Sequence, residues 1–414
     1  MKIRSLLLGS VAAAGLSTGG AYAADLGVLT SLDVCDSLGL SGLTISSDTN
    51  CLQITGSVKY TFTWGDYEQG PNDPSADFDN SELDSISWDY GNGDNDWDSS
   101  YEAWLKFVAT ADSDFGPAKA VIKLLAEGTT AVDANNNNVG DLVVADEAYV
   151  QIGDSTVIMA GLKGSIFNDS DDEPLNWLGL FMSESVDSGV TDSTGIATGG
   201  HVIQVTSDLG NGISVGGALE DLNDDGTAVG LIAYKGDGLS AHASFKAGDI
   251  LDGNVDDWAV HAGFTGTFDN FKVVAAGAFD SNDYWNVLAS ASATFDMFTI
   301  AASGEATSED EWGVGASASA TVTDGVTLNI GGRMFEENDG DQIYQVAASV
   351  AAEVTETITL TGEVGYIDEE GDDLFYGSGK LAWAPGGGFT SSVKATVNSD
   401  DAYKIETEFK KTFE

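Results

Sequence analysis

The alternation of apolar and polar residues is the most regular feature of the chain. From Leu52 to Trp64 every even position carries an apolar residue or glycine, and every odd position carries Gln, Ser, Thr or Lys. Successive side chains of a β-strand point to opposite faces, so this segment predicts a strand with one apolar and one polar face. Similar segments follow one another to the C-terminus. A soluble β-sandwich would give the same alternation, so further features must separate the two classes.

The lengths of the connections favour a barrel in a membrane. Short turns rich in Gly, Asp and Asn join strands into hairpins, as at Gly210–Gly212 and Asp269–Asn270. The connections between successive hairpins are acidic and often longer, as at Gly65–Asp98 and Gly164–Gly200. Short turns at one end and longer loops at the other are typical of outer-membrane barrels.

Aromatic residues mark both ends of several predicted hairpins. Trp258, Trp285 and Trp312 are 27 residues apart, and each opens a strand after an acidic connection. Pairs of Phe flank two of the tight turns that follow. Trp at one end and Phe at the other predict the two aromatic belts of a membrane barrel. A solenoid or propeller would also repeat, but it would not place aromatics at both strand ends so consistently.

The composition of the two faces indicates which one points outward. The apolar face contains many small residues, as in Ala289–Ala293, whereas the other face is rich in Ser and Thr. A soluble core would need the reverse arrangement. We therefore predict an all-β fold, a closed antiparallel transmembrane β-barrel over residues 51–413. The pattern gives 20 strands, namely one opening strand, nine hairpins and one closing strand, while uncertain boundaries leave 16 or 18 open.

Charge and composition exclude several classes of function. The chain has 67 Asp plus Glu against 16 Lys plus Arg, a net charge of −51, which disfavours nucleic acid as a partner. Hydrophobic residues make up 42%, with 9% aromatics, which argues against disorder. Three histidines leave little for a His-based metal centre, and no catalytic constellation accompanies them. We therefore expect neither an enzyme nor a resident cofactor.

The N-terminal segment has the pattern of a signal peptide. Lys2 and Arg4 precede a short apolar stretch, and Ala21–Ala23 supplies a small-x-small cleavage site. The apolar stretch is too short for a membrane-spanning helix, although an anchoring helix is the alternative. We expect residues 1–23 to be a signal peptide and residues 24–50 to precede the barrel.

Residues near the start, middle and end of the chain carry a family resemblance. They are Val34–Asp36 with Thr49–Tyr60, Glu147–Gln151 with Ala160–Lys163, and Phe409–Phe413. Together they resemble the alphaproteobacterial porins of the Rhizobiales type. The resemblance implies a 16-stranded homotrimer among outer-membrane lipid and lipopolysaccharide, with the C-terminal strand recognised by the barrel assembly machinery. It also implies that the loop after strand five narrows the pore. The chain departs from the usual pattern at its end, where Lys411 and Glu414 stand in place of apolar residues.

Basic residues define the candidate pore wall. Phasing each strand by its apolar face places 13 of the 14 basic residues after the signal peptide on the lumenal face. A cation facing lipid at the midplane costs about 2–4 kcal/mol, which supports this placement. Four of these residues are predicted near mid-height beside the loop Gly164–Gly200: Lys59, Lys106, Lys123 and Lys163. If the loop folds inward, its carboxylates face these lysines across a constriction: Asp169, Asp171, Asp172, Glu173, Glu184 and Asp187. The alternative is an external acidic loop.

The two cysteines predict a disulfide. Cys35 and Cys51 enclose 15 residues just before the first strand. The periplasm is oxidising, and closing a loop of this size stabilises the fold by about 3 kcal/mol. The alternative is two free thiols. The bond would pin either the segment that precedes the barrel or a plug folded back at its mouth.

These observations predict an outer-membrane porin for the passive diffusion of small hydrophilic solutes, with a preference for cations. A first alternative is a substrate-selective channel, for which the inward-facing Trp104 is a hint. A second alternative is a non-conducting barrel, either an enzyme or a structural protein.

Asp94–Asp98 has alternating carboxylates but lacks the Gly and Glu of an EF-hand, which leaves only a weak Ca²⁺ or Mg²⁺ site between acidic loops.

Overall fold

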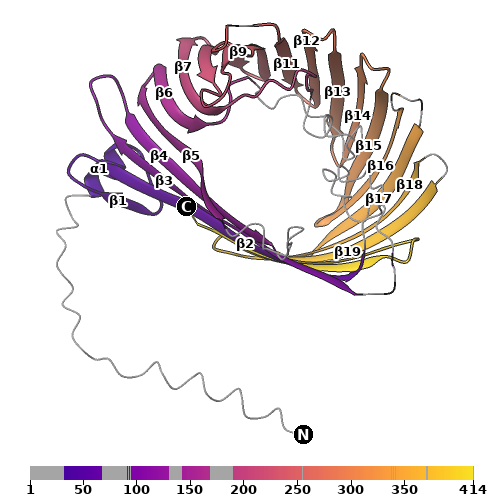
Figure 1. Cartoon of the computed structure of the whole chain (residues 1–414). Coiled ribbons are helices and arrows are strands. Elements are labelled where there is room, and N and C mark those ends of the chain that lie inside the picture. The colour runs from indigo at the N-terminus through magenta and orange to yellow at the C-terminus, as the bar shows by residue number, and fades with distance from the viewer. Residues whose placement is uncertain are drawn as a thin grey trace, which may run out of the picture.

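The chain folds into one closed antiparallel barrel (Figure 1). The computed structural model describes residues 32–67, 91, 93, 95–129, 142–167, 190–253, 255–336, 338, 340, 342–369 and 372–413. The 21 strands of these described ranges belong to one sheet, in which β1 lies outside the ring and the other strands pair in chain order. Pairing of the last strand with β2, with Gly56 opposite Phe413, closes the ring.

The ring consists of twenty strands, as the sequence pattern predicted. They are β2 (Cys51–Asp66), β3 (Asp96–Ala111), β4 (Ala118–Thr129), β5 (Leu142–Gly153), β6 (Thr156–Lys163), β7 (Gly200–Gly210), β8 (Ile213–Glu220), β9 (Thr227–Gly236), β10 (Leu239–Ala247), β11 (Trp258–Phe268), β12 (Phe271–Asp280), β13 (Trp285–Phe295), β14 (Phe298–Thr307), β15 (Trp312–Thr323), β16 (Val326–Glu336), β17 (Gln342–Thr355), β18 (Ile358–Glu369), β19 (Asp372–Gly386), β20 (Phe389–Asn398) and β21 (Tyr403–Phe413). The family resemblance implied sixteen strands, and this number is wrong. Each hairpin of the sequence pattern is present and pairs with both of its neighbours in the ring.

The two ends of the barrel differ in their connections. At the end where β2 begins and β21 ends, which we call the short-turn end, turns of two residues join several hairpins. Three of them begin with a residue in the left-handed region, namely Asn211, Asp269 and Asp296, with φ of 55°, 50° and 53°. Asn and Asp tolerate this region, which the tightest hairpin turns require. The longer connections lie at the opposite end, which we call the loop end.

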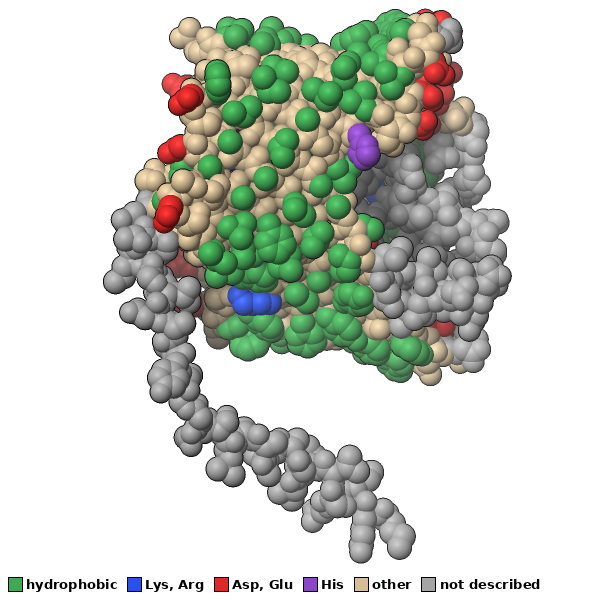
Figure 2. Space-filling model, turned by 60° about the vertical axis from the view of Figure 1, so that its left-hand side comes forward, with side chains coloured by type: hydrophobic (Ala, Val, Ile, Leu, Met, Phe, Trp, Pro, Cys, Tyr) green, Lys and Arg blue, Asp and Glu red, His purple; other side chains and the backbone are tan. Residues whose placement is uncertain are grey.

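The outer face is apolar and carries aromatic side chains at both ends. At the loop end, Trp258, Trp285 and Trp312 are the first residues of β11, β13 and β15. At the short-turn end, the rings of Phe271 and Phe295 are 5.9 Å apart, and both are exposed. Figure 2 shows hydrophobic side chains spread over one outer face, with Asp and Glu at its margins. This is the distribution expected of a barrel that crosses a membrane.

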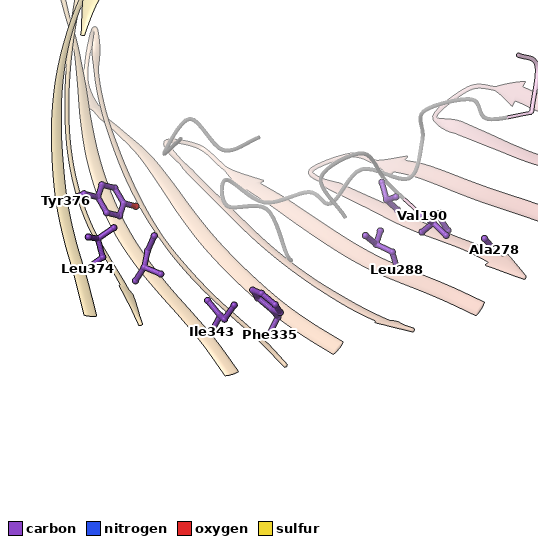
Figure 3. Close-up of a cluster of buried hydrophobic side chains, with 10 residues drawn as sticks. Val190, Ala278, Leu288, Phe335, Ile343, Leu374 and Tyr376 are labelled. Carbon is purple, nitrogen blue, oxygen red and sulfur yellow. The ribbon is translucent and has the colours of Figure 1, made fainter. Parts of the chain in front are cut away.

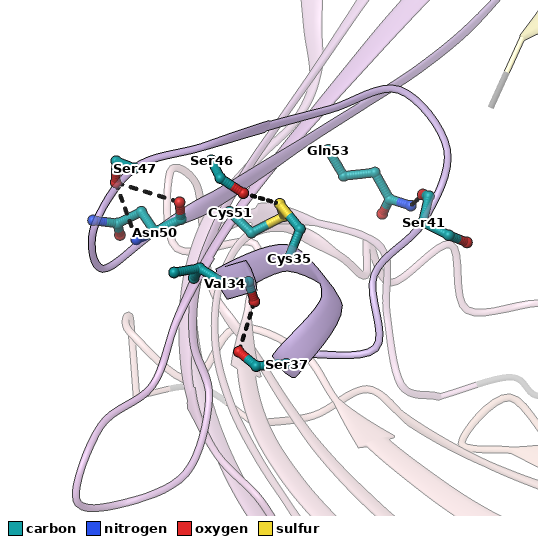
Figure 4. The surroundings of a disulfide bond; sticks show 9 residues. All are labelled: Val34, Cys35, Ser37, Ser41, Ser46, Ser47, Asn50, Cys51 and Gln53. Carbon is teal, nitrogen blue, oxygen red and sulfur yellow. Dashed lines mark hydrogen bonds between the residues drawn. A yellow bond between two sulfur atoms is a disulfide. The ribbon is translucent and has the colours of Figure 1, made fainter. Parts of the chain in front are cut away.

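A small unit precedes the barrel and is fastened to its first strand (Figure 4). It contains α1 (Leu32–Ser37) and β1 (Thr44–Ser46), and β1 pairs with the first residues of β2. A disulfide joins Cys35 to Cys51, with 5.0 Å between their Cα atoms, which confirms the predicted bond. The pairing of β2 with β21 starts only at Gly56, so β1 covers part of the edge that β21 leaves open.

The predicted signal peptide, residues 1–23, lies outside the described residues. In the part of the chain that is described, no helix is long and apolar enough to cross a membrane.

Candidate functional site

The inner wall between β2 and β6 carries ion pairs between neighbouring strands. On β2 the exposed Val58 and Tyr60 face outward, so the alternation turns Lys59 into the lumen. The same alternation places the other three predicted lysines on the inner face. We call these lysines and their carboxylate partners the paired row: Lys59, Glu102, Lys106, Lys123, Asp146, Glu147 and Lys163.

Glu147 on β5 is the centre of the paired row. Its Oε2 lies 2.6 Å from the Nζ of Lys106 on β3, and its Oε1 lies 3.1 Å from the Nζ of Lys163 on β6. The three side chains are 19–31% exposed, so water reaches them. Ion pairs with this exposure contribute little to folding stability, at most about 1 kcal/mol each. Their main effect is on the charge distribution of the lumenal surface.

A β-bulge brings a second carboxylate into the row. Lys123 on β4 is opposite Glu147, but the next residue, Leu124, is opposite Ala145, so Asp146 is the extra residue of β5. The Nζ of Lys123 lies 2.6 Å from a carboxylate oxygen of Asp146. Strict alternation would have turned Asp146 away from Glu147. The bulge instead lets both adjacent carboxylates contact lumenal lysines.

The row continues onto β2 and is flanked by aromatic rings. The Nζ of Lys59 lies 3.3 Å from Glu102 on β3. The Nζ of Lys123 lies 5.6 Å from the ring centre of Trp104, and that of Lys163 lies 4.9 Å from the ring centre of Tyr149. The prediction that Trp104 faces inward agrees with this contact. The four lysines are therefore paired with carboxylates of the wall itself.

The loop between β6 and β7 begins and ends against the inner wall. Both ends are held by Glu220, a fully buried residue at the end of β8. Its Oε1 accepts the N–H of Ile166 at 3.1 Å, and its Oε2 accepts the N–H of Gly199 at 2.7 Å. The side-chain amide of Gln204 on β7 donates to the same carboxylate and to the carbonyl of Gly164, both at 3.0 Å. One carboxylate thus binds the first and last described segments of the loop.

Further contacts fix the returning part of the loop. Asp192 forms an ion pair of 2.8 Å with Lys246 on β10, and both side chains are less than a tenth exposed. The N–H and hydroxyl of Ser193 donate to Asp280 on β12 at 2.7 and 2.8 Å. The hydroxyl of Thr227 on β9 donates to the carbonyl of Ala197 at 2.7 Å. Because these strand residues face the lumen, both described ends of the loop lie inside the barrel.

Apolar contacts support the same placement. Phe167 is buried against Ala218, Val229 and Ala259, which face inward from β8, β9 and β11. Val190 belongs to a cluster of buried side chains that follows the inner wall (Figure 3). In Figure 3 it lies close to Leu288 and Ala278, and the cluster continues to Phe335, Ile343, Leu374 and Tyr376.

Two histidines lie beneath the first end of the loop. His242 on β10 and His261 on β11 are buried, and the Nε2 of His242 is 2.8 Å from the Nδ1 of His261. The rings are stacked, and the ring of Phe167 lies 6.1 Å from that of His261. The alternation along β10 and β11 puts both histidines on the inner face, but nothing in the sequence indicates that they contact each other.

The predicted acidic side of the constriction falls outside the described residues. Residues 168–189 are not described, and they include all six predicted carboxylates: Asp169, Asp171, Asp172, Glu173, Glu184 and Asp187. Their placement opposite the lysines stays a prediction. Asp94 of the weak cation site is also outside the described residues. Within the described ranges, no group of three or more His, Cys, Asp or Glu side chains has the arrangement of a metal site.

The loop end of the barrel is strongly acidic in its described part. Neighbouring Asp224 raises the pKa of the Asp225 carboxyl above its ordinary value, and Asp249, Asp252 and Asp221 add to the effect together with desolvation. Each carboxylate disfavours ionisation of the next, which is the effect of crowded like charges. Clustered carboxylates of this kind make the local electrostatic potential negative.

Comparisons with known proteins identify relatives of this chain. A family model described as a porin subfamily matches residues 31–403. A Sinorhizobium fredii chain described as an outer membrane protein is 30% identical over 184 residues, 42% of this chain and 46% of that one, so the match spans about half of this relative. Porin Omp2a of Brucella ovis is 26% identical over 304 residues, 68% of this chain and 80% of that one.

The solved structures found by similarity of fold are distant. A variant of Rhodopseudomonas blastica porin has a TM-score of 0.39 at 12% identity and covers 87% of this chain and all of its own. OccAB3 of Acinetobacter baumannii has a TM-score of 0.48 at 8% identity, with 87% and 99% covered.

Proposed function

The chain belongs to the porin subfamily, and we propose that it forms a water-filled channel for the passive diffusion of small hydrophilic solutes, with a preference for cations. It is an outer-membrane protein whose strands cross the membrane repeatedly, and membership of a porin family points to a channel and not to an enzyme. One observation carries the proposal: the loop after β6 is bound at both ends to the lumenal wall, beside a wall of water-accessible charged side chains.

The cation preference is supported by the distribution of charge. In the paired row, four lysines contact three carboxylates, so little net positive charge remains there to attract anions. The loop end adds clustered carboxylates such as Asp224 and Asp225. Carboxylates at the mouth of a pore raise the local concentration of cations, and the effect weakens as salt rises.

Planar bilayers test both parts of the proposal. Purified protein should give discrete conductance steps, and a KCl gradient should give a reversal potential of the sign expected for K⁺ over Cl⁻. Joint replacement of Asp169, Asp171 and Asp172 by Asn and of Glu173 by Gln should lower this preference, because the predicted constriction loses four negative charges. Absence of conductance would refute the channel, and an unchanged reversal potential in the variant would refute the role of the loop.

The assembly of the protein is also a proposal. A homotrimer surrounded by lipid and lipopolysaccharide follows from the family resemblance, and the mass of the complex in detergent, before and after heating, tests it. The closing strand β21 exposes Ile405 and Phe409 on its outer face, which supports its recognition by the barrel assembly machinery. Lys411 donates to the carbonyl of Thr412 at 2.7 Å and to that of Gly387, so its charge lies among carbonyl groups at the short-turn end.

A further inference from the structure

The paired row presents both signs of charge to the same part of the lumen. Along β3, β5 and β6 the charged groups follow in the order ammonium, carboxylate and ammonium, with contacts of 2.6 and 3.1 Å around Glu147. Lys123 and Asp146 form a second pair of 2.6 Å beside them. All these side chains are between about a fifth and two fifths exposed, so a dissolved solute can reach them without displacing the wall.

A solute with one charge and a solute with two opposite charges meet this row differently. A solute with only a negative charge can bind a lysine of the row only by displacing the wall carboxylate that is paired with that lysine. A solute with only a positive charge must likewise displace a lysine from its carboxylate. A solute that carries an ammonium and a carboxylate close together can replace both partners at once. The charged groups of the wall then stay paired throughout, which avoids the cost of an uncompensated charge.

The residues beside the row suit the remainder of such a solute. Trp104 and Tyr149 present aromatic rings next to Lys123 and Lys163. Aromatic rings bind apolar groups and attract cationic ones. A small apolar side chain attached to a zwitterionic centre therefore finds a complementary surface within the row.

We propose that the paired row selects zwitterionic solutes of the α-amino acid class over uncharged and singly charged solutes of the same size. The inference rests on the proposed channel and specifies its substrate class. The ammonium of the solute binds the carboxylates of Glu147 and Asp146. Its carboxylate binds the ammonium groups of Lys106 and Lys163. No covalent step is involved.

Solutes matched in size to alanine give the test. Proteoliposomes are exposed to alanine, to lactamide as its uncharged counterpart and to sodium lactate as the anion, and the initial rates of swelling are compared. The expected ratio of the alanine rate to the lactamide rate is about two to five, the range that one exposed ion pair supplies. Glu147→Gln should lower this ratio towards one and raise the lactate rate relative to lactamide, because Lys106 and Lys163 lose their common partner.

Two further variants keep the test decisive. Glu353→Gln makes the same chemical change on β17, outside the row, and should leave the ratio at the wild-type value. Asp146→Asn should lower the ratio as Glu147→Gln does, and it serves if the first variant fails to fold. The inference is overturned if the alanine rate equals the lactamide rate in the wild type, or if the ratio of these rates is the same in all three variants. Neither result contradicts the proposed channel. If lactamide enters proteoliposomes no faster than it enters protein-free vesicles, both the proposed channel and the inference are overturned.

Discussion

Replacement of Glu220 by Gln tests how the loop is held inside the barrel. The carboxylate accepts hydrogen bonds from the N–H groups of Ile166 and Gly199 and from the side chain of Gln204, at 2.7–3.1 Å, in a site with no exposure to water. A glutamine of nearly the same shape has one acceptor oxygen and one NH₂ group. That NH₂ must face one of the two backbone N–H groups, so one buried donor loses its partner.

The size of the effect follows from these contacts. Hydrogen bonds to a charged group contribute about 1.5–3 kcal/mol each, neutral ones about 1 kcal/mol, and an orphaned buried donor costs about 1–3 kcal/mol. We expect Glu220→Gln to weaken the binding of the two loop ends by about 2–5 kcal/mol. This corresponds to at least a roughly 30-fold increase in the equilibrium between released and bound ends.

Hydrogen–deuterium exchange measures this equilibrium directly. Peptides that contain residues 164–167 and 190–199 should exchange faster in Glu220→Gln than in the wild type, because exchange of a bonded amide follows its opening. A peptide from β20 should be unaffected, because the loop contacts described above do not involve that strand, and Glu353→Gln, the same chemical change on β17, serves as the control variant. Equal exchange of the two loop peptides in the wild type and in Glu220→Gln would refute the view that this carboxylate holds the loop.

Three further predictions concern other parts of the molecule. Unreduced protein should show no reaction with a thiol reagent, and joint replacement of Cys35 and Cys51 by Ser should lower the stability of the pre-barrel unit by about 3 kcal/mol, measured by its resistance to proteolysis. Gly212→Ala should slow formation of the heat-resistant folded band on gels, since Gly212 has a φ of 79° and an added Cβ would lie 2.1 Å from the carbonyl of Lys235. Burial and nearby carboxylates raise the pKa of Tyr284 to about 12, so the absorbance difference between the wild type and Tyr284→Phe should titrate near pH 12 and not near pH 10.

Local patterns in the sequence were sufficient to predict the strands and their orientation. The side chains of a strand alternate strictly, so Lys59 could be assigned to the lumen from its neighbours alone, and the Trp residues at 258, 285 and 312 marked strand starts correctly. The cysteine spacing gave the disulfide for a similar reason, because both residues lie within one short segment. Each of these inferences depends only on residues close in sequence.

Contacts between distant residues could not be predicted in this way. The bulge at Asp146 breaks the alternation on which the phasing depended, and adjacent Asp and Glu inside a strand were its only visible signal. Glu220 binds Ile166, which is 54 residues earlier, and nothing around Glu220 indicates this partner. The sequence likewise predicted lumenal lysines opposite loop carboxylates, whereas the contacts that the structure describes for them are with neighbouring strands.

The seam between β2 and β21 has a consequence for the order of biosynthesis. Every other strand of the ring pairs with strands adjacent in the chain, but Ser57 and Thr412, which lie 3.5 Å apart at this seam, are separated by 355 residues. Loop-closure entropy makes such a pairing the slowest to form. Hairpins can therefore accumulate as translation and export proceed, while the barrel keeps two open edges until the eleven residues of β21 arrive. A chain shortened by that strand would retain every hairpin turn and still be left with the unpaired edges that favour aggregation.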